Sequence, residues 1–286
     1  MRPFSYERPT SLADAIARLA QFGADARPLA GGTDLIIRLR DRTVEPGLVV
    51  DVKRILELDD GIRETETGRT IGARTTMTTI AADPGIRREH LALAEAAAVV
   101  GSVQIRNRAT LAGNICNASP AADTLPALLV DDAVVLVVGP AGERRIPIDG
   151  VLVRSGVTTL AVGELVTAIE LPRPLRPRGT VHVRRTRRRG HDLASVTLAC
   201  AVDDAGVTRI AYGSLGPRPW LVRDDTGALA DPAVPDDAKR ARLLELFTAA
   251  SPSATSLRAG PDYRVAMLHV LGLRAVHLAI ARLADA

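Results

Sequence analysis

Two glycine-containing polar segments hold the residues whose types could bind a ligand. In the first, residues 29–35 read LAGGTDL, so that two glycines, a hydroxyl and a carboxylate follow a short apolar run. Glycine permits positive φ and close approach to the main chain, while Thr33 and Asp34 are residue types that open helices. A strand, a glycine turn and a helix start in this order favour the binding of an anion, although an ordinary tight turn has the same composition.

The second segment, residues 104–124, reads QIRNRATLAGNICNASPAADT and is more polar than the stretches on either side. We expect it to form a loop, because polar loops between buried elements often carry binding sites. Asp123 could accept hydrogen bonds from a ligand hydroxyl or ring N–H, and the alternative is a capping loop before a helix near residue 122. Its other small or hydrogen-bonding residues include Thr110, Gly113, Asn114 and Ser119. Together, the two segments indicate a ligand with more than one polar part.

The order of the expected elements predicts an α+β fold. A capping box at Ser11 opens a helix that ends at Gly23, and with the strand at 47–52 it predicts a small βαβ unit. Further strands are expected near 69–73, 133–138, 165–171, 181–185, 194–202 and 208–213, and further helices near 75–82, 85–100, 122–130, 237–250 and 262–284. The proline-rich segment 171–179 predicts a linker between two domains.

The composition is that of a globular chain with internal cores. With 286 residues, 47% of them hydrophobic, the chain is long enough for two domains. The longest strongly apolar run, 133–138, is too short to span a bilayer, and the first residues lack a secretory signal, so we expect a cytoplasmic protein. Cys116 and Cys200 are isolated in apolar sequence and are expected in the core, with no disulfide framework and no metal site.

Positive charge is concentrated in one run, residues 183–191, which reads VRRTRRRGH. Such a run could bind nucleic acid, bind phosphate or face a protein partner. Aromatic residues make up only 2% of the chain, so platforms for base stacking are absent and we expect no nucleic-acid binding. The scattered histidines His182, His191, His269 and His277 are expected on the surface or in packing roles, so we assign no catalytic residue.

The two polar segments together resemble the flavin-binding medium subunit of the molybdenum hydroxylases, the group that includes xanthine dehydrogenase and carbon monoxide dehydrogenase. Similar residues also recur at 163–166, 169–172, 187–194 and 262–264. The resemblance implies an FAD-binding domain of the vanillyl-alcohol-oxidase/PCMH-like type over residues 1–176, built from α+β subdomains at about 1–56 and 57–176. A small α+β C-terminal domain with an antiparallel sheet would follow over residues 177–286.

The resemblance also implies which residues contact FAD. The first FAD loop would comprise Leu29, Ala30, Gly31, Gly32, Thr33, Asp34 and Leu35, with its N–H groups on the pyrophosphate, and the second Thr110, Leu111, Ala112, Gly113 and Asn114. Asp123 and the apolar Val166 match further FAD contacts, and Ser119 is a nearby donor. A lysine of the family is replaced here by Arg185, or by Arg184 if the register slips by one, and arginine has a planar fork instead of a point donor.

The function implied is electron transfer by a flavoprotein subunit. FAD would receive electrons from the [2Fe–2S] clusters of a small iron–sulfur subunit and deliver them to NAD or another acceptor, while a large subunit would carry molybdopterin and select the substrate. The family forms heterotrimers, expected here as a dimer of heterotrimers. The alternatives are a self-sufficient flavin oxidase, a non-catalytic interaction subunit and an RNA-binding module that uses the arginine run.

Overall fold

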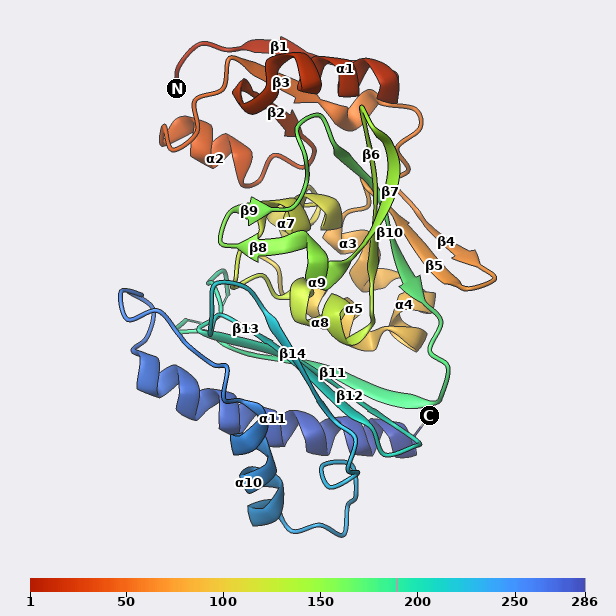
Figure 1. The fold of residues 1–286 in the computed structure, drawn as a ribbon, viewed down its shortest axis with the longest axis vertical. Helices are drawn as coiled ribbons and strands as arrows, with labels where there is room; N and C mark the ends of the chain where they lie inside the picture. The colour runs from red at the N-terminus through yellow and green to blue at the C-terminus, as the bar shows by residue number, and fades with distance from the viewer. Residues whose placement is uncertain (189, 286) are drawn as a thin grey trace.

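The computed structural model describes residues 1–188 and 190–285; Arg189, which belongs to the arginine run, and Ala286 lie outside the described residues. The chain forms three parts that follow one another along the longest axis of the molecule (Figure 1). A small parallel sheet at the N-terminus is followed by a central part with a larger sheet and several short helices, and then by a sheet backed by a long helix. The α+β fold class expected from the sequence is confirmed.

The N-terminal part is the expected βαβ unit. Its strands β1 (Ser5–Glu7), β2 (Ala26–Leu29) and β3 (Leu48–Asp51) are parallel in the order β1-β3-β2. Helix α1 (Leu12–Phe22) is capped by the Ser11 hydroxyl, which accepts from the Asp14 N–H at 3.1 Å, and it ends at Gly23. The helix start indicated at Thr33 and Asp34 is present: the short helix α2 (Leu35–Arg40) has Asp34 at its N-cap and connects β2 to β3. Because the strands are parallel, their carboxyl ends meet at one edge of the sheet.

The central part contains an antiparallel sheet with the order β4-β5-β10-β6-β7. Its strands are β4 (Ile62–Thr65), β5 (Gly68–Gly72), β6 (Val134–Gly139), β7 (Gly142–Pro147) and β10 (Leu165–Pro172). Between them lie α3 (Met77–Ala82), α4 (Pro84–Glu89), α5 (Leu91–Ala98), α6 (Val103–Arg106), α7 (Leu111–Asn117), α8 (Thr124–Val130), α9 (Ile148–Val151) and the hairpin β8 (Leu152–Arg154) and β9 (Val157–Thr158). Short 3₁₀ turns at Gly23–Asp25 and Val52–Arg54 complete the first two parts.

Three expectations for this region were wrong. The helix expected at 85–100 is divided into α4 and α5, because His90 leaves helical geometry with φ −134° and ψ 45°. The expected loop at 104–124 contains α6 and α7; in α7, Leu111 and Ile115 are buried one helical turn apart, so packing outweighs the low helix propensity of Gly and Asn. Cys116 is exposed, whereas Cys200 is buried as expected.

The C-terminal part is a four-stranded antiparallel sheet covered on both faces. Its strands β11 (Arg178–Arg185), β12 (Val196–Asp203), β13 (Thr208–Gly213) and β14 (Trp220–Asp224) pair in sequence order. The long helix α11 (Pro261–Ala284), with α10 (Asp236–Leu246), lies on one face, and α5 and α8 of the central part lie on the other (Figure 1). The linker is shorter than the expected 171–179. Strand β10 continues through Pro172 and β11 begins at Arg178, so the connection between them is 173–177.

Strand β12 shows how the sheet joins the two halves of the chain. Leu198 and Cys200 pack in the cluster formed with α11, whereas the alternating Ala199 and Ala201 pack in the central core. Side chains alternate between faces along a strand, so one strand contributes to both cores. Helix α11 is the one described helix long and apolar enough to cross a membrane, but its buried face covers this sheet, as in the core helix of a soluble protein.

An ion pair ties the central sheet to its helices. Arg69 of β5 donates from Nε and Nη2 to the two oxygens of Glu89, at the end of α4, at 3.1 and 3.0 Å. Both side chains are largely buried. The hydrogen bonds from Arg69, opposed by burial and helped by Arg88, lower the pKa of Glu89 from 4.5 to about 2.

This pair predicts a specific acid sensitivity. Because the pKa is lower in the folded state, the pair stabilises the protein fully above pH 4.5, and this stabilisation is lost as the pH falls toward 2. Glu89→Gln should therefore lower the free energy of unfolding at pH 7 by about 1–3 kcal/mol, with a smaller deficit at pH 3. Urea unfolding at both pH values measures this difference. Glu64→Gln, which removes the exposed second partner of Arg69, is the control and should cost less than about 1 kcal/mol; a pH-independent deficit in Glu89→Gln would contradict the assignment.

Candidate cofactor-binding site

The first glycine segment leaves the carboxyl end of β2 and touches the second segment directly. A Cβ atom on Gly31 would lie 2.1 Å from the carbonyl oxygen of Arg108 and 3.0 Å from the Cα atom of Ala109. These contacts are to main-chain atoms, so a side chain at position 31 could not be accommodated by rotation of a neighbour. Gly32 has φ +77°, a conformation that glycine adopts without strain. Glycine is therefore required at both positions, for different reasons.

The second segment is held from its other side by the residues after β5. The N–H of Met77 donates to the carbonyl of Ala109 at 2.9 Å, and the N–H of Leu111 donates to that of Thr75 at 3.3 Å. Thr110 then caps α7, since its hydroxyl accepts from the N–H of Gly113 at 3.1 Å. The main chain at 108–111 is thus fixed between Gly31 and the segment 75–77.

Side-chain hydrogen bonds connect α2, α7 and α8. Asn117 donates to Asp34 at 3.1 Å and accepts from Arg38 at 2.5 Å, which joins α7 to α2. Asn114 accepts from the hydroxyl of Thr124 at 2.6 Å, which joins α7 to α8. Asp34 and Asn114 therefore use side-chain oxygens to hold the protein together.

The remaining residues of the two loops have mainly structural side chains. Leu29 and Leu35 pack with Leu39 and Val49 in a small apolar cluster. The other apolar members, Ala30, Leu111 and Ala112, pack with the central core, and Ser119 accepts from the N–H of Ala121. Thr33 is half-buried and Gly113 is exposed. Main-chain groups, more than side chains, are thus what the first loop can offer to a ligand.

Asp123 has a polar atom that the protein does not satisfy. It occupies the N-cap position of α8, but its side chain makes no capping hydrogen bond. The carboxylate faces β11 instead: Oδ2 accepts from Arg184 at 2.8 Å, and Oδ1 lies 3.5 Å from Nε2 of His182. Oδ1 is buried and has no hydrogen-bond partner. A buried acceptor of this kind is costly unless something donates to it, so it fits a ligand hydroxyl or ring N–H.

The two candidate arginines lie on opposite faces of β11. Arg184 faces α8 and Asp123, whereas Arg185 is exposed and donates from Nε to the Tyr263 hydroxyl of α11 at 2.9 Å. Val166 of β10 is buried in the central core beside an irregularity in the β10–β6 pairing. The structure brings Arg184, and not Arg185, to Asp123.

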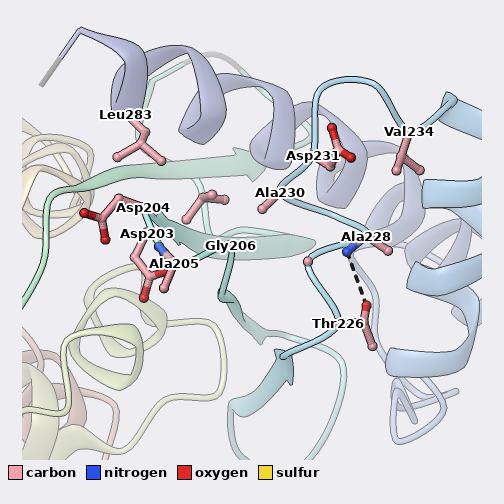
Figure 2. A pocket seen from close by; sticks show the side chains of 12 residues that line it. Asp203, Asp204, Ala205, Gly206, Thr226, Ala228, Ala230, Asp231, Val234 and Leu283 are labelled. Atoms are coloured by element: carbon pink, nitrogen blue, oxygen red, sulfur yellow. Dashed lines mark hydrogen bonds between the residues drawn. The ribbon is translucent and has the colours of Figure 1, made fainter.

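A separate hollow lies elsewhere. It has a volume of about 660 Å³ and lies in the C-terminal part, between the β12–β13 turn, residues 226–234 and Leu283 (Figure 2). Asp203, Asp204 and Asp231 lie on its walls, so its charge disfavours an anionic cofactor. The predicted site residues do not line it. We therefore place the candidate site along α2, α7 and α8, which follow one another toward the C-terminal sheet in Figure 1.

The histidines have varied surroundings. His182 is buried and lies 3.0 Å from the Thr197 hydroxyl, His269 is packed against Phe247, and His277 lies on the surface 2.8 Å from Asp236. Burial lowers the pKa of His269. Sequence reasoning did not foresee that His182 would adjoin Asp123, and it overlooked the buried His90. Within the described ranges, no three His, Cys, Asp or Glu side chains gather into a metal-binding group.

Comparison with known proteins identifies the family of the chain. Residues 2–174 match the family model of the FAD-binding domain in molybdopterin dehydrogenase. The carbon monoxide dehydrogenase medium chain of Hydrogenophaga pseudoflava is 31% identical over 285 residues, 98% of each chain. The putative xanthine dehydrogenase FAD-binding subunit of Escherichia coli is 36% identical over 221 residues, 75% of each chain. A chain in the structure of reconstituted CO dehydrogenase from Oligotropha carboxidovorans superposes with a TM-score of 0.90 at 30% identity, covering 98% of this chain and 99% of that one.

The chain therefore belongs to the family of FAD-binding domains of molybdopterin dehydrogenases. It is an FAD-binding flavoprotein subunit of a molybdenum hydroxylase, an oxidoreductase of the carbon monoxide and xanthine dehydrogenase type. The resemblance seen in the sequence is thus confirmed.

The contact at Gly31 predicts a large effect from a single methyl group. Gly31→Ala should force the loop at 29–35 away from Arg108 and lower the free energy of unfolding by about 1–3 kcal/mol, as overpacking does. Gly260→Ala is the matched control, because the space around Gly260 is open and its φ is −65°. Its effect should stay within about 1 kcal/mol. Urea unfolding compares the two, and wild-type stability of Gly31→Ala would refute the close contact.

Proposed function

We propose that this chain binds FAD between the two glycine loops and the Asp123–Arg184 pair, and that it passes electrons from the iron–sulfur clusters of a partner subunit to NAD or another acceptor. The observation that carries the proposal is the linkage of three separate features: Gly31 touches the main chain at 108–109, and Asn114 of the second loop bonds Thr124, the neighbour of Asp123. The loop at Gly31, the fixed main chain at 108–111 and the unsatisfied oxygen of Asp123 come from different elements. An extended ligand with several polar groups fits such a series better than a compact one.

Each loop has a defined role in this proposal. The main chain at 30–33 turns at Gly32 and presents N–H groups to the pyrophosphate, because no side chain at Gly31 or Gly32 covers it. The residues at 110–114 contact the cofactor from the other side. When bound, FAD supplies an isoalloxazine ring that takes up electrons singly and releases them in pairs. The protein contributes position and electrostatics, and no side chain needs to transfer a proton.

At the far end, Asp123 and Arg184 act together. We propose that Oδ1 of Asp123, which has no partner in the protein, accepts a hydrogen bond from a ligand hydroxyl or ring N–H. We assign to Arg184 the place of the family lysine, because Arg185 points to Tyr263 instead. Since Arg184 already donates one N–H to Asp123, the rest of its planar fork remains available to the cofactor. Val166 is proposed as an apolar neighbour of the site.

We further propose partner subunits and a domain division. Two similar proteins are named as a medium chain of carbon monoxide dehydrogenase and a FAD-binding subunit of xanthine dehydrogenase, so similar subunits serve different substrates. A large molybdopterin subunit would select the substrate, and a small [2Fe–2S] subunit would supply electrons, within a cytoplasmic dimer of heterotrimers. We divide the chain into a FAD-binding domain at 1–176 and a C-terminal domain at 177–286. Arg184, in the C-terminal domain, completes the proposed site.

The role of Asp123 can be tested by FAD titration. Asp123→Ala should leave a polar group of FAD unpaired and weaken binding by about five- to a hundredfold, equivalent to about 1–3 kcal/mol. The dissociation constant is measured by quenching of flavin fluorescence on the full chain, alone and with its partner subunits. An unchanged constant would assign Asp123 a purely structural role.

Adjacent arginines supply a matched pair for the same titration. Arg184→Ala should weaken FAD binding by about tenfold, the loss of one charge-assisted hydrogen bond. Arg185→Ala, one residue along the strand and on its other face, should leave the constant unchanged. Equal effects of the two variants would show a general role for positive charge instead of a directed contact.

The electron source should be another polypeptide. A [2Fe–2S] cluster usually needs four cysteine thiolates, and this chain has two cysteines, Cys116 and Cys200. The purified chain loaded with FAD should therefore contain no iron or molybdenum, and purines, aldehydes or carbon monoxide should not bleach its flavin. Metal analysis and anaerobic spectra test this, and bleaching should appear once the partner subunits are added. Stoichiometric iron, or bleaching without partners, would favour a self-sufficient enzyme.

A further inference from the structure

A buried charged cluster lies at the opposite end of α8 from Asp123. Asp131, at the C-cap of this helix, accepts from Arg178 at 2.5 Å through Oδ1, and its Oδ2 lies 3.1 Å from Nδ1 of His90. The same Nη2 of Arg178 donates to the carbonyl of Glu89 at 3.2 Å. Asp131 and His90 are completely buried as side chains. The proposed FAD contacts do not include any of these residues.

The cluster is costly to assemble, so its geometry is strongly constrained. A carboxylate at the C-terminus of a helix meets the negative end of the helix dipole. Burial alone would raise the pKa of Asp131, but Arg178 and His90 hold it below its usual value. Loss of one member would leave a buried charge without compensation, which is far more destabilising than loss of an exposed ion pair.

Arg178 and Arg184 stand on the same face of the same strand. Even-numbered residues of β11 face the central domain, and each makes a polar contact there: Arg178 with Asp131, Thr180 with the N–H of Ala92, and Arg184 with Asp123. His182 also lies on this face, 3.5 Å from Asp123 by its ring. Helix α8 and strand β11 are thus pinned to each other at both ends, by Asp131–Arg178 and by Asp123–Arg184.

We propose that Arg178, held by Asp131 and His90, is a positioning residue of the cofactor site: it sets the place of β11 along α8 so that Arg184 meets Asp123. This inference rests on the proposed function. A β-strand transmits the constraint because its residues advance by a fixed rise of about 3.3 Å, so that displacement of Arg178 displaces Arg184. Arg178 is also the first residue of β11, directly after the connection at 173–177. In that connection Arg173 donates to Glu64 and Arg176 to Asp204, so Arg178 is the residue at the start of the strand that contacts α8.

The first experiment separates positioning from general stabilisation. Arg178→Gln should weaken FAD binding by roughly two- to thirtyfold, the range expected for coupling through a packed element. Arg178→Lys, which retains the charge, should restore part of this loss. The control is Arg209→Gln: Arg209 of β13 also crosses between the domains, to Asp132 and the carbonyl of Leu129, but it is not on β11. It should lower the melting temperature without changing FAD affinity.

If Arg178→Gln fails to fold, the double variant Asp131→Asn with Arg178→Gln removes both charges and leaves neither uncompensated. It should fold and show the same weakened FAD binding. Equal FAD affinity in this variant and in the wild type would overturn the inference.

The second experiment is a double-mutant cycle between Arg178 and Arg184. If Arg178 acts through Arg184, then Arg178→Gln should add little to the loss caused by Arg184→Ala. Fully additive losses would overturn the inference, because they would show that Arg178 acts by another route. Wild-type chain that fails to bind FAD would instead refute the proposed function. Wild-type binding that Arg178→Gln leaves unchanged would refute this inference alone.

Discussion

The structure depends on one contact between main chains, that of Gly31 with Arg108 and Ala109. A Cβ atom at position 31 would lie 2.1 Å from a carbonyl oxygen, so the two segments approach as closely as backbones can. The contact joins the N-terminal parallel unit to the central part and places the two glycine loops beside each other. Because the second loop is fixed on its other side by residues 75–77, this contact also determines where the first loop must lie.

The C-terminal part reaches the proposed site because its sheet is buried on both faces. Strand β12 places alternate residues in two different cores, and β11 places alternate polar side chains against α5 and α8. The main-chain carbonyl of Thr180 in β11 accepts from Arg282 of α11. Helix α8 contacts both parts: it lies within the central core, and residues at its two ends pair with arginines of β11. The proposed FAD contacts Asp123 and Arg184 therefore come from the central and the C-terminal parts of the chain.

Arginine is used here mainly to connect elements. Arg69, Arg178 and Arg184 each pair with a carboxylate that is distant in sequence, and their planar guanidinium groups suit such partly buried pairs. Arg282 similarly joins α11 to Glu95 of α5 and to the carbonyl of Thr180 at the edge of β11. Many of the arginines of the chain are therefore engaged in internal ion pairs and hydrogen bonds.

The sequence by itself determined the family, the βαβ unit and the main strands. Local patterns suffice for these, because alternation, capping at Ser11 and the turn at Gly32 act through neighbouring residues. Only the tertiary structure showed that Gly31 is required by its contact with Arg108. Only the tertiary structure decided that 111–117 is helical, since burial of Leu111 and Ile115 outweighs the polar residues between them. It also decided that Arg184, and not Arg185, meets Asp123, and that Asp123 faces β11 instead of capping α8. The orientations of Arg184 and Asp123 depend on which face of β11 packs against α8. Residues far apart in the chain determine that packing, so local sequence patterns cannot predict it.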